Sequence, residues 1–240
     1  MKIESFPRKL FLFRNNLCMF AQTQNELHNM KHMSILAVSL LALVACTPEK
    51  KQEADYSQYV NPMIGTDFTG NTYPGAQVPF GMVQLSPDNG LPGWDRISGY
   101  FYPDTTIAGF SHTHLSGTGA GDLYDISFMP VTRPYKEAPA PLGIYSTFSH
   151  NDEAASAGYY RVLLKDYNIN VELTATERCG IQRYTFPEAE ASVFLNLKKA
   201  MNWDFTLDSK IEVVDSTTIR GYRLSQGWSP LQHVYFETRF

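Results

Sequence analysis

Apolar and polar residues alternate with a period of two along much of the second half of the chain. The alternation is clearest in Val171-Glu-Leu-Thr-Ala and Lys210-Ile-Glu-Val, and it is typical of strands that bury one face. Enrichment in β-branched and aromatic residues predicts strands over residues 81–85, 159–164, 169–175, 181–186, 192–197, 210–214, 217–224 and 233–240. Spacings of about ten residues between strands are those of a sandwich. The pattern therefore predicts an all-β fold, an antiparallel β-sandwich over residues 56–240.

The first 55 residues follow a different pattern. A basic start at Met30 leads into an apolar run, residues 35–45, which ends in Leu43-Val-Ala-Cys46 and resembles the lipobox of bacterial lipoproteins. The run is too short for a permanent membrane span. We therefore expect residues 1–29 to be an over-extended leader, residues 30–45 a lipoprotein signal peptide, Cys46 the lipidated residue and residues 46–55 a flexible tether. Such a protein is exported and lipid-anchored to the outer membrane, on its periplasmic or cell-surface face.

Cysteine usage and charge narrow the possible classes of protein. Cys18 lies in the predicted leader and Cys46 is the predicted lipid site, so no disulfide is expected within the sandwich. Cys179 is expected to be a small buried residue in a strand. After residue 45 the chain has 15 basic and 22 acidic residues, a formal net charge of −7. Because no basic patch accompanies this charge, nucleic acid is not expected as a partner.

Functional side chains concentrate in one stretch, residues 94–125, which reads WDRISGYFYPDTTIAGFSHTHLSGTGAGDLYD. His112 and His114 are two positions apart, so on a strand they would project to the same face. A zinc site needs three or four protein ligands, and Cys179 is the nearest thiol, which weakens a metal interpretation. The GTGAG run is followed by acidic residues and lacks a Lys-Ser/Thr pair, which weakens a phosphate-loop interpretation.

Two further interpretations of this stretch are favoured over these. Trp and Tyr faces suit the C–H faces of sugar rings, and His, Asp and Ser side chains bond hydroxyl groups, so the stretch could form a pocket for a neutral, hydroxyl-rich ligand. A turn-rich loop with satisfied core histidines is the structural alternative.

The last predicted strand, residues 233–240, reaches the final residue without a turn or a polar tail. We therefore expect the chain to be C-terminally truncated.

Five separated blocks of sequence resemble the N-terminal domain of glycoside hydrolase family 92, the exo-acting α-mannosidases common in gut Bacteroidetes. The blocks are YVNPMIGT at 59–66, NTYPGAQVPFGMVQLSPD at 71–88, SGYFY at 98–102, GFSHTHLSGTGAGD at 109–122 and GWSPLQHVYF at 227–236. The resemblance runs over residues 56–240 and rests on these separated blocks, which in this length and order are highly specific.

This resemblance implies a two-domain enzyme, in which an N-terminal sandwich joins an (α/α)6-barrel domain that is missing here. It implies a calcium-dependent exo-α-mannosidase, often acting on α-1,2 linkages, that hydrolyses terminal α-mannosides of glycans with inversion. An inverting enzyme uses one carboxylic acid and one carboxylate base. The resemblance places both of them, and most calcium ligands, in the missing domain. No catalytic residue and no metal ligand is therefore expected in this chain, which should be inactive alone.

The resemblance implies that the sandwich forms part of the mannose pocket. The substrate-binding residues expected in it are Trp94, Asp95, His112, His114, Ser116, Gly117 and Asp122. Trp94 is expected to form a wall against the sugar ring, and Asp122 to bond loop amides or sugar hydroxyls. The alternative function, from a different class, is a glycan-binding surface lipoprotein without catalytic activity. A small metal-dependent enzyme built around the two histidines is a third possibility.

Overall fold

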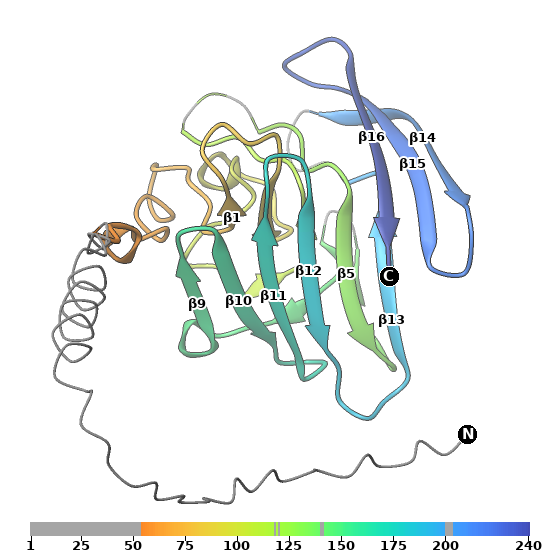
Figure 1. Cartoon of the computed structure of the whole chain (residues 1–240), viewed down its shortest axis with the longest axis horizontal. Helices are drawn as coiled ribbons and strands as arrows, with labels where there is room; N and C mark the ends of the chain where they lie inside the picture. The colour runs from red at the N-terminus through yellow and green to blue at the C-terminus, as the bar shows by residue number, and fades with distance from the viewer. Residues whose placement is uncertain (1–53, 118, 120, 140–141, 200–203) are drawn as a thin grey trace, which may run out of the picture. The chain divides into compact units, whose positions relative to one another are not determined.

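The computed structural model describes residues 54–117, 119, 121–139, 142–199 and 204–240 (Figure 1). The predicted leader, signal peptide, lipidation site and nearly all of the tether lie outside these residues. Within them the secondary structure is β-strand, with three short 3-10 turns and no α-helix. The 3-10 turns are η1 (Ser57–Tyr59), η2 (Trp94–Arg96) and η3 (His150–Asp152).

Strands hydrogen-bond in five antiparallel sheets. The first sheet has the order β1 (Ala76–Gln77), β2 (Gln84–Asp88), β4 (Gly109–Ser111), β5 (Ser127–Thr132) and β13 (Ala191–Asn196). The second has the order β12 (Gly180–Thr185), β11 (Ile169–Ala175), β10 (Tyr159–Leu164) and β9 (Glu153–Ser156). The third is β14 (Phe205–Val213), β15 (Thr218–Gln226) and β16 (Gln232–Arg239). Two ribbons complete the fold, β3 (Thr106–Ile107) with β8 (Ser146–Thr147), and β6 (Glu137–Ala138) with β7 (Gly143–Ile144).

The main hydrophobic core lies between the first two sheets. Leu85, Phe110 and Val131 enter it from the first sheet, and Val162 and Val171 enter it from the second. All five side chains are inaccessible to solvent. Two antiparallel sheets that share one apolar core form a β-sandwich, so the predicted fold class is confirmed.

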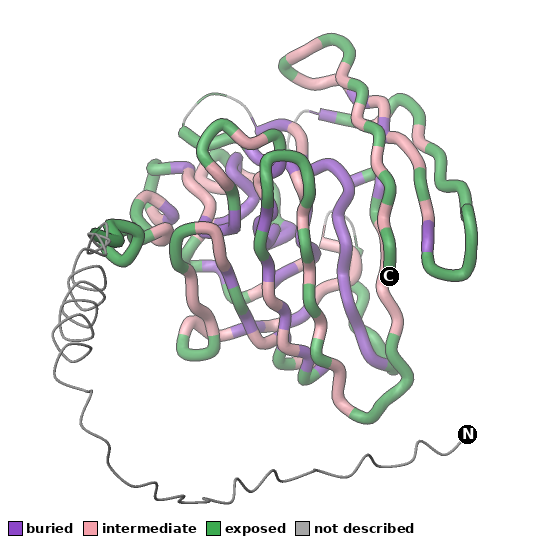
Figure 2. Tube along the Cα trace, in the orientation of Figure 1, coloured by how far each residue is buried: buried purple, intermediate pink, exposed green. Residues whose placement is uncertain are grey.

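The third sheet packs on the first through one face of β16. Val234 and Phe236 contact a smaller core formed by Ile126, Phe128 and Leu197. The opposite face of this sheet carries polar residues and the cross-strand pair Tyr222 and Tyr235. Figure 2 shows β5 buried along its length, whereas most of the third sheet is exposed or half-buried.

The predicted strands agree with the structure where one face of a strand is buried. The bounds of β10 and β11 are those expected, because every second residue of each strand enters the core. β14 begins at Phe205, five residues before the expected start, and its pairing with β15 shifts between Thr206 and Asp208. β5 was not predicted from the sequence.

The prediction for Cys179 is wrong. The residue is exposed and lies in the turn between β11 and β12, where its backbone N–H donates to the Thr176 hydroxyl at 3.2 Å. The turn must reverse the chain, and this keeps the thiol outside the sheet. Among the residues that the structure describes, no helix has the length and apolar character needed to cross a membrane.

Candidate functional site

Three loops pack together at one end of the sandwich, around residues 121–125. The hydroxyl of buried Tyr124 donates to the carbonyl of Ile97 at 2.5 Å, which fixes the loop that begins at η2. The backbone N–H of Tyr124 donates to the carbonyl of Thr113 at 3.1 Å. The carboxylate of Asp122 accepts the N–H of Trp228 at 2.8 Å, which brings in the turn between β15 and β16. Loops from distant parts of the sequence thus meet in one place, which we call the loop end.

Trp94 and Asp95 lie on η2 at the edge of this loop end. The Trp94 side chain is 52% exposed, and Asp95 is half-buried. The next residue, Arg96, anchors the turn with two hydrogen bonds to Asp104, at 2.5 and 2.6 Å, and stacks over the ring of Phe101. A bidentate ion pair of this kind restricts the backbone on which Trp94 is carried. The indole is therefore held on a fixed turn with its face open to solvent.

His114 is a core histidine. Its Nδ1 donates to the carbonyl of Gln84 at 2.7 Å, and its Nε2 lies 2.8 Å from Oδ1 of Asp88 and 3.0 Å from the Ser111 hydroxyl. The side chains of His114 and Asp88 are both inaccessible to solvent. A carbonyl and a carboxylate accept only, so both ring nitrogens of His114 are placed as donors. His114 therefore bonds the loop that carries it to β2.

The buried carboxylate of Asp88 is balanced by two cationic groups. Burial by itself would raise the pKa of Asp88, but the charges of Lys199 and His114, with the hydrogen bonds from His114 and Ser111, lower it below its usual value. Lys199 Nζ lies 3.2 Å from Oδ2 as an ion pair, although without the alignment of a hydrogen bond. Gly99 packs against Asp88 and His114, and a Cβ at this position would lie 2.6 Å from Oδ1 of Asp88.

His112 has different surroundings from His114. Its Nδ1 donates to the carbonyl of Ile126 at 2.7 Å, and its Nε2 lies 3.4 Å from the side-chain nitrogen of Gln182. Burial lowers the pKa of His112, which favours the neutral ring, and Nε2 faces a side-chain nitrogen of Gln182 that can donate to it. The ring borders a cavity of about 400 Å³ between β12 and β16. The two histidines therefore share no ligand.

Asp122 is buried and fully engaged by protein donors. Its Oδ1 accepts the N–H of Leu123 at 2.7 Å, and its Oδ2 accepts the side chain of Gln232 at 2.7 Å in addition to the N–H of Trp228. Of the two roles expected for Asp122, the structure contains the contacts to loop groups. Its contact with a sugar stays a prediction.

Ser116 and Gly117 are exposed at the surface of the loop end. Gly117 has a φ of +82°, in the left-handed region, and its N–H donates to the carbonyl of Asn71 at 2.7 Å. No atom lies within 4 Å of the position that a Cβ at Gly117 would occupy. The glycine is therefore explained by its backbone conformation and not by close packing.

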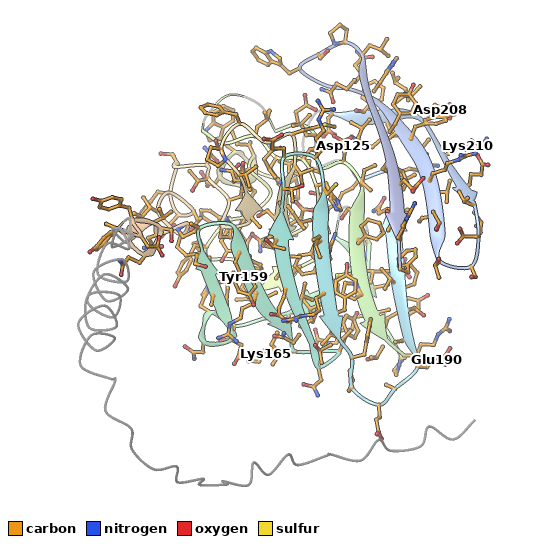
Figure 3. All side chains as sticks on the ribbon, viewed as in Figure 1. Asp125, Tyr159, Lys165, Glu190, Asp208 and Lys210 are labelled. Atoms are coloured by element: carbon orange, nitrogen blue, oxygen red, sulfur yellow. The ribbon has the colours of Figure 1, made fainter. Side chains whose placement is uncertain are left out.

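A buried arginine that the sequence analysis missed joins the third sheet to the loop end. Arg223 on β15 is 0% exposed, and its guanidinium donates to Asp125 at 2.6 Å and to Asp204 at 3.1 Å. It also donates to the Thr206 hydroxyl and to the carbonyls of Leu123, Leu197 and Lys199. Asp125 also accepts the hydroxyl of Thr113 at 2.7 Å. Figure 3 places Asp125 at the loop end, between β5 and the third sheet.

The described residues do not fit a calcium site. Calcium needs six to eight oxygen ligands, and carboxylates usually supply several of them. The buried carboxylates of the loop end, Asp88, Asp122 and Asp125, all face protein donors. In the described ranges no group of three or more His, Cys, Asp or Glu side chains is placed to hold a metal ion.

Comparisons with known proteins agree with one another. The family model for the glycosyl hydrolase family 92 N-terminal domain matches residues 59–240. An α-mannosidase of family GH92 from Bacteroides thetaiotaomicron, solved in complex with mannoimidazole, is 43% identical with a TM-score of 0.71, over 75% of this chain and 24% of that chain. A second GH92 glycosyl hydrolase structure is 28% identical with a TM-score of 0.64, over 76% of this chain and 26% of that one.

A curated relative, an uncharacterized secreted glycosidase from Arthroderma benhamiae, is 26% identical over 172 residues, 68% of this chain and 21% of the relative. The chain thus spans about a quarter or less of the length of these relatives. The family match confirms the resemblance predicted from the five sequence blocks. This chain belongs to glycoside hydrolase family 92, and residues 59–240 match the N-terminal domain of that family.

Proposed function

We propose that this chain is the N-terminal sandwich portion of an inverting, calcium-dependent exo-α-mannosidase acting on terminal α-mannosides of glycans. The observation that carries the proposal is the family match over residues 59–240, together with 43% identity to a family α-mannosidase. In this proposal the loop end forms part of the mannose pocket, and the acid, the base and the calcium ligands come from polypeptide outside the described residues.

The state of the carboxylates at the loop end supports this division of roles. An inverting hydrolase needs two carboxyl groups on opposite faces of the sugar, with room for a water molecule. Asp88, Asp122 and Asp125 are each at most 1% exposed and bonded to protein donors. They have no free face for a leaving oxygen or a water. Asp95, beside Trp94, is half-buried and differs in this from the three buried carboxylates.

Trp94 is the residue proposed to contact the mannose ring. Its indole is 52% exposed on a turn held by Arg96 and Asp104, as a preorganised platform requires. His114 and Asp122 are proposed to act through the backbone that they hold. Ser116 offers a hydroxyl at the surface, and Gly117 sets the conformation of the exposed loop through its hydrogen bond to Asn71.

Export and membrane anchoring are part of the same proposal. The Arthroderma relative is described as a secreted glycosidase, which supports export. Lipidation at Cys46 and attachment to the outer membrane rest on the sequence pattern at residues 30–46. Palmitate labelling of the wild type and of Cys46→Ala in a bacterial host tests them; equal labelling of the two proteins contradicts lipidation at Cys46.

The purified chain should release no mannose from α-1,2-mannobiose, because the described residues of the loop end offer no free pair of carboxyl groups. The measurement is the mannose released over time, with the Bacteroides thetaiotaomicron α-mannosidase as the active control. Turnover by this chain above the rate without protein would place the reaction within it and overturn the division of roles.

In a polypeptide with full mannosidase activity that includes this chain, Trp94→Ala should raise KM and lower kcat/KM, because the aromatic platform is lost. The fall in kcat/KM should correspond to a loss of about 1–3 kcal/mol of transition-state stabilisation. Trp94→Phe is the matched control and should retain most of the activity. An unchanged kcat/KM in Trp94→Ala would show that the indole does not face the sugar.

The second candidate function is glycan binding without catalysis, favoured by the open aromatic side chains of Trp94 and Trp228. Reading the encoding DNA beyond the codon for Phe240 separates the two functions. A frame that continues into a helix-rich region with two candidate carboxyl groups supports the mannosidase. A stop codon directly after Phe240 supports the binding protein.

A further inference from the structure

The turn between β15 and β16 carries an open tryptophan. Residues 227–231 form the turn, closed by a hydrogen bond from the N–H of Gly227 to the carbonyl of Ser229 at 3.0 Å. Trp228 is 77% exposed in this turn. In Figure 1 the turn projects at the top of the view, at the same end as the loops between β4 and β5.

A buried carboxylate fixes this exposed residue. Oδ2 of Asp122 accepts both the N–H of Trp228, at 2.8 Å, and the side chain of Gln232, at 2.7 Å. A Cβ at Gly227 would lie 2.3–2.6 Å from the atoms of that carboxylate, so the close approach depends on glycine. Gln232 is held in turn by the hydroxyl of Ser225, which donates to it at 3.0 Å. The turn is thus bonded at both of its ends to a residue more than one hundred positions earlier in the chain.

The core does not explain why the indole is held there. A turn that only reversed the chain could carry a polar residue at this position, because the anchoring bonds use the backbone N–H of Trp228 and leave its side chain in water. An apolar side chain in a preorganised turn reduces the ordering cost of binding a partner.

The chemistry of the turn selects the kind of partner. Residues 227–232, Gly-Trp-Ser-Pro-Leu-Gln, contain no charged side chain. An indole face flanked by hydroxyl and amide groups suits the C–H face and the hydroxyls of a neutral sugar ring, and it offers nothing to an anion such as phosphate. Trp94 lies on another loop, which is bonded to residues 121–125 by the hydrogen bond from the Tyr124 hydroxyl to the carbonyl of Ile97.

We propose that Trp228 is a second aromatic platform of this protein, which stacks on a pyranose ring of the glycan, and that Asp122 and Gly227 are the positioning residues that present it. This proposal rests on the proposed function, since it assigns a further contact to the same glycan site.

The test is a titration of the full chain with α-1,2-mannobiose and, separately, with cellobiose, following the indole N–H signals of the tryptophans by NMR. The variants are Trp228→Ala, Trp228→Phe and Trp94→Ala. Tyr235→Ala is the matched control, because Tyr235 is 67% exposed on the same hairpin but lies on the outer face of β16 beside Tyr222. These side chains are exposed, so the substitutions should leave the fold intact, as the dispersion of the backbone amide signals will show.

The proposal expects the dissociation constant for mannobiose to rise about three- to tenfold in Trp228→Ala, to change little in Trp228→Phe and to stay unchanged in Tyr235→Ala. The indole signal of Trp228 should shift on binding in the wild type. Asp122→Asn, which keeps one acceptor oxygen but loses the charge, should weaken binding less than Trp228→Ala.

Each other outcome separates the two proposals. If the wild type binds mannobiose and Trp94→Ala weakens it while Trp228→Ala does not, Trp228 is no sugar platform and the proposed function stands. If cellobiose binds in a way that depends on Trp228, and mannobiose does not bind, the platform stands and the mannoside assignment fails. If neither sugar shifts any indole signal, the platform proposal is overturned, whereas the proposed function, which rests on the family match, is judged by the activity assay.

Discussion

The sandwich core and the loop end are held together by different physics. β10 and β11 pair in an unbroken antiparallel register, and on their inner face the contacts are apolar, because alternate residues such as Val162 and Val171 enter the core. At the loop end the buried groups are charged, as in Asp88 with His114 and Lys199, and Asp125 with Arg223. Apolar packing tolerates substitution of similar volume, whereas a buried charge requires a partner in one geometry. The loop end is therefore the more precisely positioned region and the more fragile one.

The largest loss of stability is expected from Arg223→Ala. It removes one side chain but leaves Asp125 and Asp204 buried without their cation, so the free energy of unfolding should fall by about 5 kcal/mol, at the upper end for a broken buried ion pair. Urea denaturation measures it. Arg220→Ala is the matched control on the same strand, where the arginine is 55% exposed and pairs with Glu212, and it should cost under about 1 kcal/mol. Equal losses in the two variants would contradict the contrast between the regions.

In the sandwich core, Leu173→Ala should lower the free energy of unfolding by about 3 kcal/mol, because it leaves a cavity where a 1% exposed side chain packs. Leu207→Ala removes the same atoms from a 48% exposed position on β14 and serves as the control. Leu173→Met should recover most of the loss, since it restores much of the volume. An Ala variant that unfolds as easily as Arg223→Ala would mean that the core is as intolerant as the loop end.

A smaller and more local effect is expected from Asp122→Ala, which leaves the N–H of Trp228 and the side chain of Gln232 without their acceptor. The free energy of unfolding should fall by about 2 kcal/mol, as for hydrogen bonds to a charged group. Hydrogen exchange at the Trp228 amide should accelerate, while that of β10 and β11 stays slow. Asp208→Ala is the control, because that carboxylate is exposed on β14 (Figure 3) and accepts the hydroxyl of Tyr222 at 2.8 Å. Unchanged exchange at Trp228 would exclude the anchoring role of Asp122.

The smallest expected effect is a change in how stability depends on pH in the acid range, through Glu172 on β11 of the second sheet. Hydrogen bonds from Arg183 and from the Tyr159 hydroxyl lower the pKa of Glu172 from 4.5 to about 2. The pKa is lower in the folded state than in the unfolded state, so this stabilisation is complete above 4.5 and is lost as the pH falls towards about 2. In Glu172→Gln the urea midpoint should vary less with pH across that window. A midpoint that varies equally in the wild type and the variant would assign the acid sensitivity to other carboxyl groups.

How far the sequence predicts this molecule depends on the range of the interactions. The bounds of β10 and β11 followed from alternation, because one face of each strand is buried. β5 was missed because all six of its residues are buried, which removes the alternation, and because Pro130 argues against a central strand. In the structure Pro130 lies opposite Val193 in the pairing of β5 with β13.

The candidate site was only partly accessible from sequence. Residue types directed attention to the segment with His112 and His114, but the partners that define their roles lie far away in the chain, as Asp88 does for His114. Arg223 gave no signal, because an arginine in an alternating strand is normally interpreted as solvent-exposed. Its inward position opposite Val234 could have suggested a buried cation, but only once the register of β15 and β16 was known.

The Arg223 contacts also set an order of events in folding. Asp125 and Arg223 are 98 positions apart, whereas β14, β15 and β16 are joined by short turns and can pair with one another locally. Contacts of high sequence separation form late, because the loop-closure entropy must be overcome before they contribute. We therefore expect the three-stranded sheet to form first as an undocked meander, with its guanidinium still hydrated, and to dock only after residues 121–125 have folded. The slowest step in reaching the native state would then be the dehydration of a single arginine.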